Sequence, residues 1–424
     1  MQSEWAWRHL GDLFRIHREG INPGAHPAEI FEHYSLPAFD ESGGPAIQTG
    51  TEIESNKSYL SLPVILVSKL NPRKPRVMLV TGSSSLRRCA STEWIPYTPE
   101  IAGVDLVFYK WLFGSTGFSR QLEKVATGST NSHVRVSPSE TLCWNVPHPP
   151  LSEQRRIAEI LDTLDEAIHK TEQVIAKLQQ MKQGLLHDLL TRGINENGEL
   201  RDPERHPEQF KDSPLGRIPR GWEVLPAEEV CLAVIDCKNR TPPLVEAGHP
   251  VVRTPNVRKG RLVHDGIVYT DSLSYMIWTQ RGQPRPGDVL ITREAPIGEA
   301  CLLPDGMANA CLGQRMMLYR ADPSKILSAF MLVALLSPQV QGFLLDKAGG
   351  STVGHVRVGD IRSLPIQIPS MVEQKRIADS FNSAEKRLLT EETGLTKLLT
   401  LKQGLMDDLL TGRVRVAVPE EATS

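Results

Sequence analysis

The chain has 424 residues, enough for two or three domains that each bury a hydrophobic core. Hydrophobic residues make up 40% and charged residues 23%, which is typical of globular proteins and excludes a largely disordered chain. The formal net charge of -2 argues against a protein that coats DNA through charge alone. Any DNA-binding surface must therefore be local, or shared with a more basic partner.

The N-terminus carries Glu4 and Arg8, and no long apolar run follows it. The sequence therefore predicts neither a signal peptide nor a membrane span, and we expect a soluble, cytoplasmic protein. The six cysteines are scattered and form no CxxC pair, so we expect core thiols and no metal site. They are Cys89, Cys143, Cys231, Cys237, Cys301 and Cys311.

The chain contains an internal repeat, which indicates its architecture before any secondary structure is assigned. Residues 129–135 recur as residues 351–357 at an offset of 222. The offset then changes by two residues, at a point that we place beyond Pro147. From there, residues 153–191 match residues 373–411 at an offset of 220. The chain is therefore expected to consist of two similar halves.

Weaker matches extend the repeat towards the N-terminus of each half. Residues 65–69 resemble residues 289–293, and Trp7-x-x-Leu10 resembles Trp222-x-x-Leu225. Each half is expected to be a β-rich mixed domain followed by one long helix. The predicted boundaries are a first domain over 1–150, a helix over 151–192, a linker over 193–220, a second domain over 221–370, a helix over 371–412 and a tail over 413–424.

Apolar residues in both helical segments follow alternating steps of four and three, which is a heptad pattern. The residues predicted to pair the helices are Ile157, Leu161, Leu164, Ile168, Ile175, Leu178, Leu185 and Leu189 in the first segment, and Ile377, Phe381, Leu388, Leu395, Leu398, Leu405 and Leu409 in the second. Thr171, Glu391, Lys182 and Lys402 interrupt this pattern, as polar residues that fix the register would.

Helix-start and helix-stop signals agree with these two segments. Ser152 is predicted as the N-cap of the first helix, and Ser370 with Glu373 as a capping box of the second. Gly193 and Gly412 occupy the expected C-terminal caps. The alternative is that each helix packs only on its own domain, but duplication at a constant offset favours pairing.

The expected fold class is α+β: two similar mixed α/β domains, each followed by a long helix, with the helices paired as an antiparallel coiled coil with pseudo-twofold symmetry. A helix of this length would measure roughly 60 Å at about 1.5 Å per residue, so the pair would hold two domains at a fixed distance. Gly394 lies inside the second helix and predicts a local bend or close packing there.

The sequence resembles the specificity subunits of type I restriction-modification systems over nearly its full length. The first half resembles a target-recognition domain of that family through the segments 34–40, 52–57, 68–73 and 91–93. The second half does so through the segments 212–216, 218–224, 286–290 and 349–352. The Pro-x-x-x-Glu-Gln-x-x-Ile helix starts resemble the spacer helices of the family, although residues 369–373 lack the proline-leucine form present at Pro150-Leu151.

This resemblance implies a protein that reads a split DNA target and performs no chemistry itself. It implies two methylation subunits, which use S-adenosylmethionine, and optionally two restriction subunits, which use ATP and Mg²⁺, with no cofactor in this chain. Two alternatives remain open, a coiled-coil scaffold with no role on DNA and a stand-alone DNA-modifying enzyme.

Motifs for chemistry are absent from the sequence. It contains neither an Asn/Asp-Pro-Pro-aromatic methyltransferase motif nor a GxxxxGK[ST] phosphate loop. The acid-x-Lys arrangement at Glu373 has its repeat counterpart at Glu153, and both fall at helix starts, where an acid complements the helix dipole. We therefore expect no catalytic residue.

Basic and amide side chains form one cluster in each half and are the candidates for contacts with base edges and phosphates. In the first half they are Lys57, Lys69, Asn71, Arg73, Lys74, Arg76, Arg87 and Arg88. In the second half they are Lys238, Asn239, Arg240, Arg253, Asn256, Arg258, Lys259, Arg261, Arg293, Gln314 and Arg315. The alternative for any single one of them is an ordinary solvated surface.

Hydroxyl groups beside glycines are further candidates, because they could meet phosphates. They are Ser129 and Thr130 in the first half and Ser351 and Thr352 in the second. They could equally be turn residues. His133 and His355 are repeated as well, but nothing nucleophilic or metal-binding is repeated with them, so we interpret both as structural.

Overall fold

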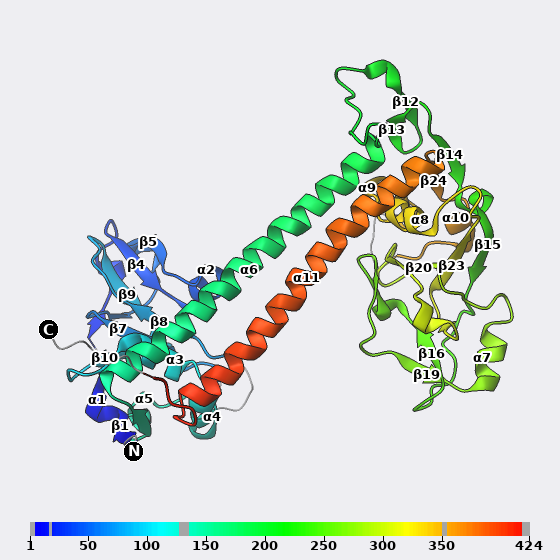
Figure 1. Cartoon of the computed structure of the whole chain (residues 1–424). Helices are drawn as coiled ribbons and strands as arrows, with labels where there is room; N and C mark the ends of the chain where they lie inside the picture. The colour runs from blue at the N-terminus through cyan, green and yellow to red at the C-terminus, as the bar shows by residue number, and fades with distance from the viewer. Residues whose placement is uncertain (1–4, 17–18, 127–134, 350–353, 418–424) are drawn as a thin grey trace. The chain divides into compact units, whose positions relative to one another are not determined.

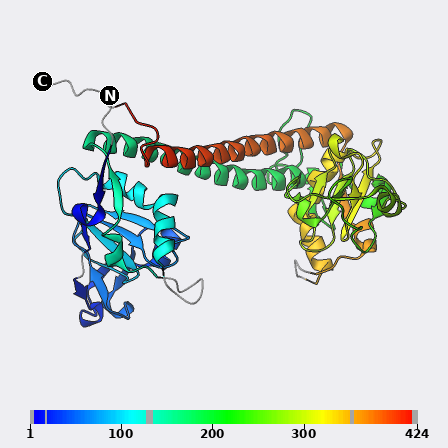
Figure 2. The same cartoon turned by 90° about the horizontal axis from the view of Figure 1, so that it is seen from below.

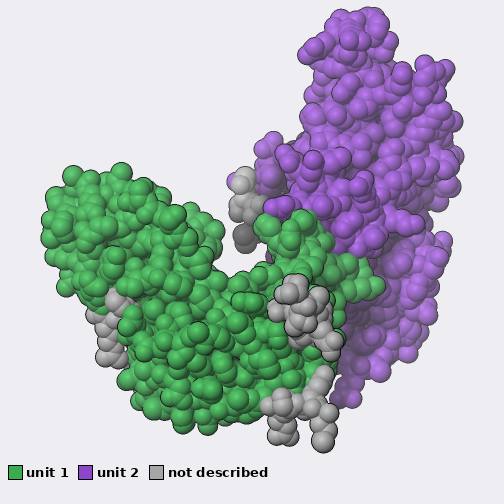
Figure 3. Space-filling view, turned by 60° about the vertical axis from the view of Figure 1, so that its left-hand side comes forward, with its two compact units in different colours: residues 1–172, 393–424 green, residues 173–392 purple. Residues whose placement is uncertain are grey.

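The computed structural model of the chain describes residues 5–16, 19–126, 135–349 and 354–417. The chain divides into two compact units, coloured separately in Figure 3. Unit 1 comprises residues 1–172 and 393–424, and unit 2 comprises residues 173–392. Each unit therefore combines one β-rich domain with the beginning of one long helix and the end of the other.

Two long helices, α6 (Leu151–Thr191) and α11 (Met371–Leu409), lie side by side (Figures 1 and 2). Helix α6 begins in unit 1 and ends in unit 2, whereas α11 begins in unit 2 and ends in unit 1. All fifteen residues that the heptad pattern assigned to helix pairing are buried or half-buried. The predicted fold class, with an antiparallel pair of long helices, is confirmed.

The termini of the long helices differ in part from the predictions. Helix α6 begins at Leu151, so Ser152 lies inside the first turn and is not the N-cap. Ser370 does cap α11, since its hydroxyl accepts a hydrogen bond from the Glu373 backbone at 3.3 Å. A Cβ atom on Gly394 would meet no atom within 4 Å, so close packing does not explain that glycine.

The described part of the domain of unit 1 contains three sheets. A four-stranded sheet has the order β2-β10-β7-β8 and a five-stranded sheet the order β3-β6-β9-β4-β5, while β1 pairs separately with β11. The strands are β1 (Ala6–His9), β2 (Phe14–Ile16), β3 (Gly20–Ile21), β4 (Ile30–Tyr34), β5 (Ala46–Thr49), β6 (Lys57–Tyr59), β7 (Val64–Ser68), β8 (Val77–Val80), β9 (Arg87–Ala90), β10 (Trp94–Pro99) and β11 (Asn145–His148). The helices are α1 (Leu10–Leu13), α2 (Leu36–Ser42), α3 (Leu106–Phe113), α4 (Thr116–Val125) and α5 (Pro138–Thr141).

The domain of unit 2 repeats much of this plan. Its four-stranded sheet has the order β15-β23-β20-β21, a three-stranded sheet has the order β19-β16-β22, and three two-stranded sheets pair β12 with β13, β14 with β24 and β17 with β18. The strands are β12 (Phe210–Ser213), β13 (Gly216–Pro219), β14 (Glu223–Pro226), β15 (Cys231–Asp236), β16 (His249–Val252), β17 (Val257–Arg258), β18 (Arg261–Leu262), β19 (Val268–Thr270), β20 (Val289–Thr292), β21 (Ala300–Leu302), β22 (Cys311–Leu312), β23 (Met316–Ala321) and β24 (Pro365–Ile368). The helices are α7 (Ser272–Trp278), α8 (Ser328–Leu335), α9 (Pro338–Lys347) and α10 (Val358–Arg362).

The four-stranded sheets correspond strand by strand. The predicted match of residues 65–69 with 289–293 places β7 and β20 at the same position, each between a long antiparallel neighbour and an edge strand. The five-stranded sheet of unit 1 and the three-stranded sheet of unit 2 each contain one parallel pair, β4 with β9 and β16 with β22. Helices α3 and α8 contact the edge strands β8 and β21, respectively. The repeat inferred from sequence is thus a repeat of topology.

Two details of the predicted repeat alignment are wrong. Trp7 of β1 lies opposite Pro147, and Val224 of β14 lies opposite Gln367. Pro147 and Gln367 are 220 positions apart, so Trp7 corresponds to Val224. The counterpart of Trp222 is therefore Trp5 and not Trp7. Trp7 is instead exposed.

The second correction concerns the two-residue change of offset. Val136 and Val356 donate the same backbone hydrogen bond, each at 3.2 Å, to Lys69 and Arg293. The offset of 220 therefore already holds at Val136, and the change lies before this residue rather than beyond Pro147.

Residues 193–220, predicted as a linker, are folded in the structure. Strands β12 and β13 pair as a hairpin, and Ile194 forms an isolated bridge with Leu200. Ile194, Leu215 and Ile218 are buried in the core of unit 2. Pro203 and Pro214 lie in turns of this packed segment, whereas Gly216 and Pro219 belong to strand β13.

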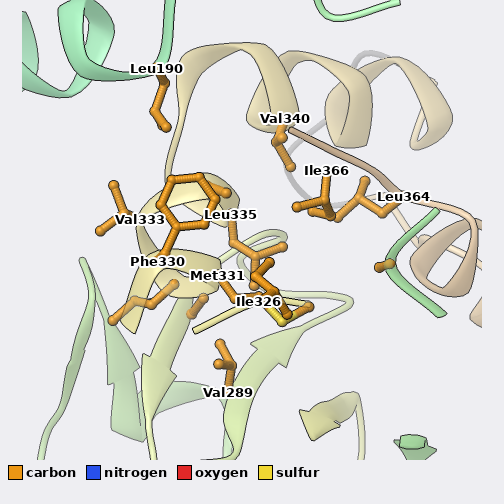
Figure 4. Packing of buried hydrophobic residues seen from close by; sticks show 14 of the residues in the cluster. Leu190, Val289, Ile326, Phe330, Met331, Val333, Leu335, Val340, Leu364 and Ile366 are labelled. Atoms are coloured by element: carbon orange, nitrogen blue, oxygen red, sulfur yellow. The ribbon is translucent and has the colours of Figure 1, made fainter. Parts of the chain in front are cut away.

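The largest core lies in unit 2, around the apolar helix α8 (Figure 4). Phe330 and Val333 on α8 pack with Val289 of β20 and Leu190 of α6. The core of unit 1 is built in the same way and contains the start of α6 and the end of α11. Each domain therefore shares its core with both long helices, rather than with its own helix alone.

Among the described residues, no single helix is long and apolar enough to cross a membrane. Helices α8 and α9 meet that length and composition only as a pair, bent by 61°. The apolar residues of α8 are buried in the core of unit 2.

Replacing Phe330 with alanine should destabilise unit 2 by about 3–5 kcal/mol, because a fully buried ring is lost and its cavity cannot close. Urea unfolding of the full chain, followed by circular dichroism, measures the change. The matched variant Leu232→Ala removes an exposed side chain of the same unit and should stay within about 0.5 kcal/mol. Equal effects of the two substitutions would show that the core is misplaced.

Candidate functional site

A buried glutamate near the start of α6 joins three segments of unit 1. The Glu153 carboxylate accepts hydrogen bonds from Arg415 Nε at 2.7 Å and Nη2 at 2.6 Å, and from Trp5 Nε1 at 2.9 Å. Burial alone would raise the pKa of Glu153, but the hydrogen bonds from Arg415 and Trp5 outweigh burial and lower it below its usual value. Glu153 is therefore ionised at neutral pH and holds the N-terminal strand and the segment after α11 at the start of α6.

Glu373 makes the equivalent junction in unit 2, near the start of α11. Its Oε1 accepts hydrogen bonds from Arg201 Nη1 at 2.5 Å and from the Ile194 backbone at 2.8 Å. Its Oε2 accepts from Trp222 Nε1 at 3.1 Å and from Arg201 Nη2 at 3.2 Å. A tryptophan, an arginine and a buried glutamate thus meet at the start of each long helix.

Gly193 and Gly412, which end the helices, adjoin these junctions. Both have positive φ values, +63° and +72°, as predicted for C-terminal caps. A Cβ atom on Gly193 would lie 2.6 Å from the Trp222 ring, and one on Gly412 would lie 2.8 Å from the Trp5 ring. Both the backbone conformation and the space beside the indole ring therefore require glycine.

The glutamine that follows each glutamate is fully buried and ties the helix to its domain. Gln154 accepts a hydrogen bond from the Asp105 backbone at 2.8 Å, and Gln374 accepts one from the Leu327 backbone at 2.8 Å. The amide nitrogen of each glutamine also donates to two backbone carbonyls, those of Gly103 and Pro149 for the first and those of Lys325 and Pro369 for the second. The Glu-Gln pair in each helix start therefore has a structural role.

Two lysines in the helix pair form matching ion pairs. Lys402 of α11 pairs with Asp165 of α6 in unit 1, and Lys182 of α6 pairs with Glu385 of α11 in unit 2. Under the offset of 220, each ion pair is the counterpart of the other. Both lysines also lie over aromatic rings, at 4.8 Å from the Trp111 centroid and 5.1 Å from the Phe381 centroid. These polar residues of the heptad pattern therefore pair across the two helices.

Most of the basic candidates in unit 1 are paired with groups of the same unit. Arg76 and Lys74 bind Asp40 and lower its pKa. The other paired groups are Arg87 with Glu29 at 3.0 Å, Arg88 with Glu32 at 2.6 Å and Lys57 with Ser55 at 2.6 Å. Among the described residues of this cluster, the side chains of Lys69, Asn71 and Arg73 have no such partner and stay the best placed for DNA.

Several candidates in unit 2 prove to be structural. Asn256 is fully buried and donates to the Val263 and Asp265 carbonyls at 3.2 and 3.1 Å, so it is not positioned to reach a base edge. Arg293 is only 8% exposed and donates to the Val356 carbonyl at 3.2 Å. Both predictions require correction, because each side chain is buried and donates to backbone carbonyls, so neither presents its donors at the surface.

Other basic groups of unit 2 also have partners within the unit. Arg258 donates to the Thr254 carbonyl at 2.6 Å, Arg253 donates to the Gly266 carbonyl at 3.0 Å, and Arg315 pairs with Glu294 at 3.0 Å. Arg261 binds Glu385 and Glu392 of α11 and so fastens the β17–β18 hairpin to this helix. Lys259 and Asn239 remain exposed, and Gln314 is half-buried.

Two of the predicted cationic residues lie over the ring of Trp278. The charged groups of Lys238 and Arg240 lie 5.1 and 5.3 Å from its ring centroid, and its Nε1 donates to the Arg240 carbonyl at 2.8 Å. The ring therefore holds both cations at the start of the segment that follows β15. The sequence clusters did not include this tryptophan, since it lies about forty residues further along the chain.

The predicted hydroxyl candidates Ser129, Thr130, Ser351 and Thr352, together with His133, lie outside the described residues. His355 is described and has a structural environment: it pairs with Glu294, and its Nε2 lies 3.4 Å from Arg293 Nη1.

The described residues contain no group of three or more His, Cys, Asp or Glu side chains that could hold a metal ion. The carboxylate of Glu373, the acid of the acid-x-Lys arrangement, accepts hydrogen bonds from Arg201 and Trp222. Burial raises the pKa of the Cys301 and Cys311 thiols to about 12, which leaves both as neutral core groups.

Comparison with known proteins gives consistent matches. The family model described as the type I restriction modification DNA specificity domain matches residues 108–180 and 219–400. The chain is 25% identical to the putative type I restriction enzyme MjaX specificity subunit of Methanocaldococcus jannaschii, over 98% of this chain and 94% of that protein. It is 23% identical to the type I restriction enzyme EcoKI specificity subunit of Escherichia coli, over 82% of this chain and 76% of that protein.

Solved structures share the fold. A chain from a study of complex assembly and conformational transition of the type I R-M system matches with a TM-score of 0.59 and 19% identity, over 97% of this chain and 98% of that one. The type I restriction-modification S subunit of M. genitalium matches with a TM-score of 0.58 and 12% identity, over 96% of both chains.

Replacing Arg415 with alanine should destabilise unit 1 by about 3–5 kcal/mol, because it leaves the buried Glu153 carboxylate without its cation. The pKa of Glu153 is lowered on folding, so its ionised form stabilises the protein above the ordinary glutamate pKa, and this contribution is lost as the pH falls through the folded value. Urea unfolding should therefore show that the difference in free energy of unfolding between the unchanged protein and Arg415→Ala becomes smaller in acid.

The matched control for Arg415→Ala is Arg413→Ala, two residues earlier. Arg413 is 68% exposed and pairs with Asp408 at the surface, so its loss should cost about 0–1 kcal/mol. An Arg415→Ala effect no larger than the control would contradict a buried junction.

Proposed function

The chain belongs to the family of type I restriction-modification DNA specificity proteins, and from this premise we propose that it reads a bipartite DNA target, one half-site with each unit. The observation that carries the proposal is the contrast between the two units. Their four-stranded sheets and their Glu-Gln helix junctions correspond, whereas their basic clusters differ in sequence and in pairing. Matching scaffolds with different surfaces are what the recognition of two different half-sites requires.

We further propose that the chain is not an enzyme by itself. Two methylation subunits would supply S-adenosylmethionine chemistry, and two restriction subunits, where present, would supply ATP- and Mg²⁺-dependent translocation and cleavage. Glu373, the acid of the acid-x-Lys arrangement, and its repeat counterpart Glu153 are both engaged in structural ion pairs, which supports this division of labour. Methyl transfer or cleavage by the purified chain alone would instead favour a stand-alone enzyme, and a reconstituted complex without sequence preference would favour a scaffold.

Exchanging residues 1–150 for the corresponding domain of another family member tests the proposed modular reading. The hybrid should retain the half-site read by unit 2 and change only the other one, because each domain carries its own surface on a shared helix pair. Mapping methylated positions made by the reconstituted complex on a random DNA library provides the measurement. A change in both half-sites would rule out modular reading.

Lys69→Ala and Arg73→Ala should each weaken DNA binding by the complex and reduce the slope of log affinity against log salt by about one, as expected for phosphate contacts. If either residue instead reads a base, discrimination at one position should fall by about 1–3 kcal/mol. The control is Arg76→Ala, since Asp40 already occupies that guanidinium on two oxygens. Unchanged binding by both variants would mean that the DNA surface lies elsewhere.

Lengthening both helices by one heptad tests whether they set the spacing between half-sites. The insertions belong between Leu178 and Lys182 in α6 and between Leu388 and Glu391 in α11, so that the apolar pattern and the Lys182–Glu385 ion pair are preserved. The spacing should grow by about 10.5 Å, or about three base pairs at roughly 3.4 Å each. Efficient methylation of only the original spacing would exclude the helices as the ruler.

A further inference from the structure

The two four-stranded sheets differ at their outer edges. In unit 2, β21 pairs with β20 on one side, and Gly260 of the β17–β18 hairpin forms a bridge with Cys301 on the other. Arg261 of the hairpin extends to Glu385 and Glu392 of α11. The edge of this sheet is therefore covered by a segment of the same chain, fastened to the helix pair by one arginine.

The equivalent edge in unit 1 is open. Strand β8 pairs with β7, and Met78 occupies the position of Cys301, since both lie opposite the matching leucines of β7 and β20. Among the described residues, no strand or isolated bridge pairs with the outer edge of β8. The segment between β4 and β5 forms helix α2 in this unit, where unit 2 has its hairpin between β16 and β19.

A groove lies along this open edge. Its volume is about 880 Å³, against about 390 Å³ for the groove that remains beside the hairpin in unit 2. Residues from both faces of β8, Val77, Met78 and Leu79, line it, together with Trp111 of α3 and Asp165 of α6. We call it the β8 groove.

One of the two acids that bind Arg261 in unit 2 has an uncovered counterpart in the lining of the β8 groove. Under the offset of 220, Glu385 corresponds to Asp165 and Glu392 to Glu172. The side chain of Asp165 is 47% exposed, whereas that of Glu385 is 17% exposed beneath Arg261. Each of these two acids also pairs with a lysine, Asp165 with Lys402 and Glu385 with Lys182. The difference is the second cation, because Glu385 binds Arg261 of the hairpin and Asp165 has no equivalent arginine among the described residues.

We propose that the β8 groove is a docking site for an extended segment of the methylation subunit, which adds to the edge of β8 and places a basic side chain against Asp165. The β17–β18 hairpin shows what fits: a strand with apolar residues towards the sheet and an arginine at the helix pair. Addition of a strand to an exposed sheet edge is a common mode of peptide recognition. This inference rests on the proposed function, in which methylation subunits are partners.

The charges of the groove favour a polypeptide over DNA. Four cations line it, but three acids do as well: Arg73, Lys110, Arg120 and Lys402 against Glu123, Asp162 and Asp165. A phosphate backbone is bound by surfaces of one sign, whereas a polypeptide can satisfy both. Within the described part of unit 1, no backbone group bonds to the outer side of β8, so a strand with alternating donors and acceptors would fit this edge.

Hydrogen exchange of the full chain, alone and with the purified methylation subunit, tests the proposal. Alternate amides of residues 76–81, those that point away from β7, should exchange about tenfold more slowly in the complex, which corresponds to the net effect of one added hydrogen bond on each. Residues 299–303 around β21 provide the internal control and should not change, because their edge is already covered. A third sample, with DNA and without the methylation subunit, should leave residues 76–81 unchanged.

A pair of variants separates docking from unspecific protection. Thr81→Trp fills the groove and should abolish the slowing at β8, while Ser83→Trp, on the same loop but outside the groove, should retain it. A complex that methylates DNA with unchanged exchange at β8 would overturn the docking site and leave the proposed function intact. Protection of β8 by DNA alone would also overturn it. Failure of the complex to assemble or to methylate would instead refute the proposed function.

Discussion

The structure depends on one buried ion pair that occurs twice, between a glutamate at the start of a long helix and an arginine that follows the end of the other helix. Glu153 with Arg415 and Glu373 with Arg201 place full charges in sites that are nearly closed to water. Such a pair is stable only when both charges are present and further hydrogen bonds satisfy the carboxylate, which Trp5 and Trp222 provide. The start of one helix and the exit of the other are thereby obliged to meet.

This constraint explains why each unit is built from segments far apart in the sequence. The core of unit 1 contains Leu161 near the start of α6 and Leu409 at the end of α11, and the core of unit 2 contains Leu189 and Phe381 in the reverse arrangement. A domain cannot lose its attachment to either helix without exposing part of its own core. None of the candidate DNA-contacting residues takes part in these junctions.

Much of this arrangement could be predicted from sequence, because it is written as periodicity and repetition. The heptad pattern through Ile157 and Ile377 predicts the paired helices, and the match of residues 65–69 with 289–293 predicts corresponding strands. The arginines of the junctions could not be found in this way, since Arg415 and Arg201 differ by 214 positions rather than 220.

The candidate DNA surface was less predictable, for a physical reason. Arg76 and Lys69 look alike in sequence, and only the fold brings Asp40 to the first and leaves the second without such a partner. Asn256 was misassigned because an asparagine that satisfies buried backbone carbonyls has the same local composition as one that reads a base edge. Where a polar side chain points is decided by tertiary packing, which a single sequence does not display.

If two equivalent units read two different half-sites at one fixed spacing, the methylation pattern of the host must reflect it. Sequencing the methylome of a host with and without the gene for this chain tests it most directly. The account predicts that removing the gene abolishes methylation at one motif, made of two unlike half-sites separated by an unread gap of a single length, with centres about one helical turn apart. Loss of methylation at a continuous motif, or at half-sites separated by variable gaps, would contradict it.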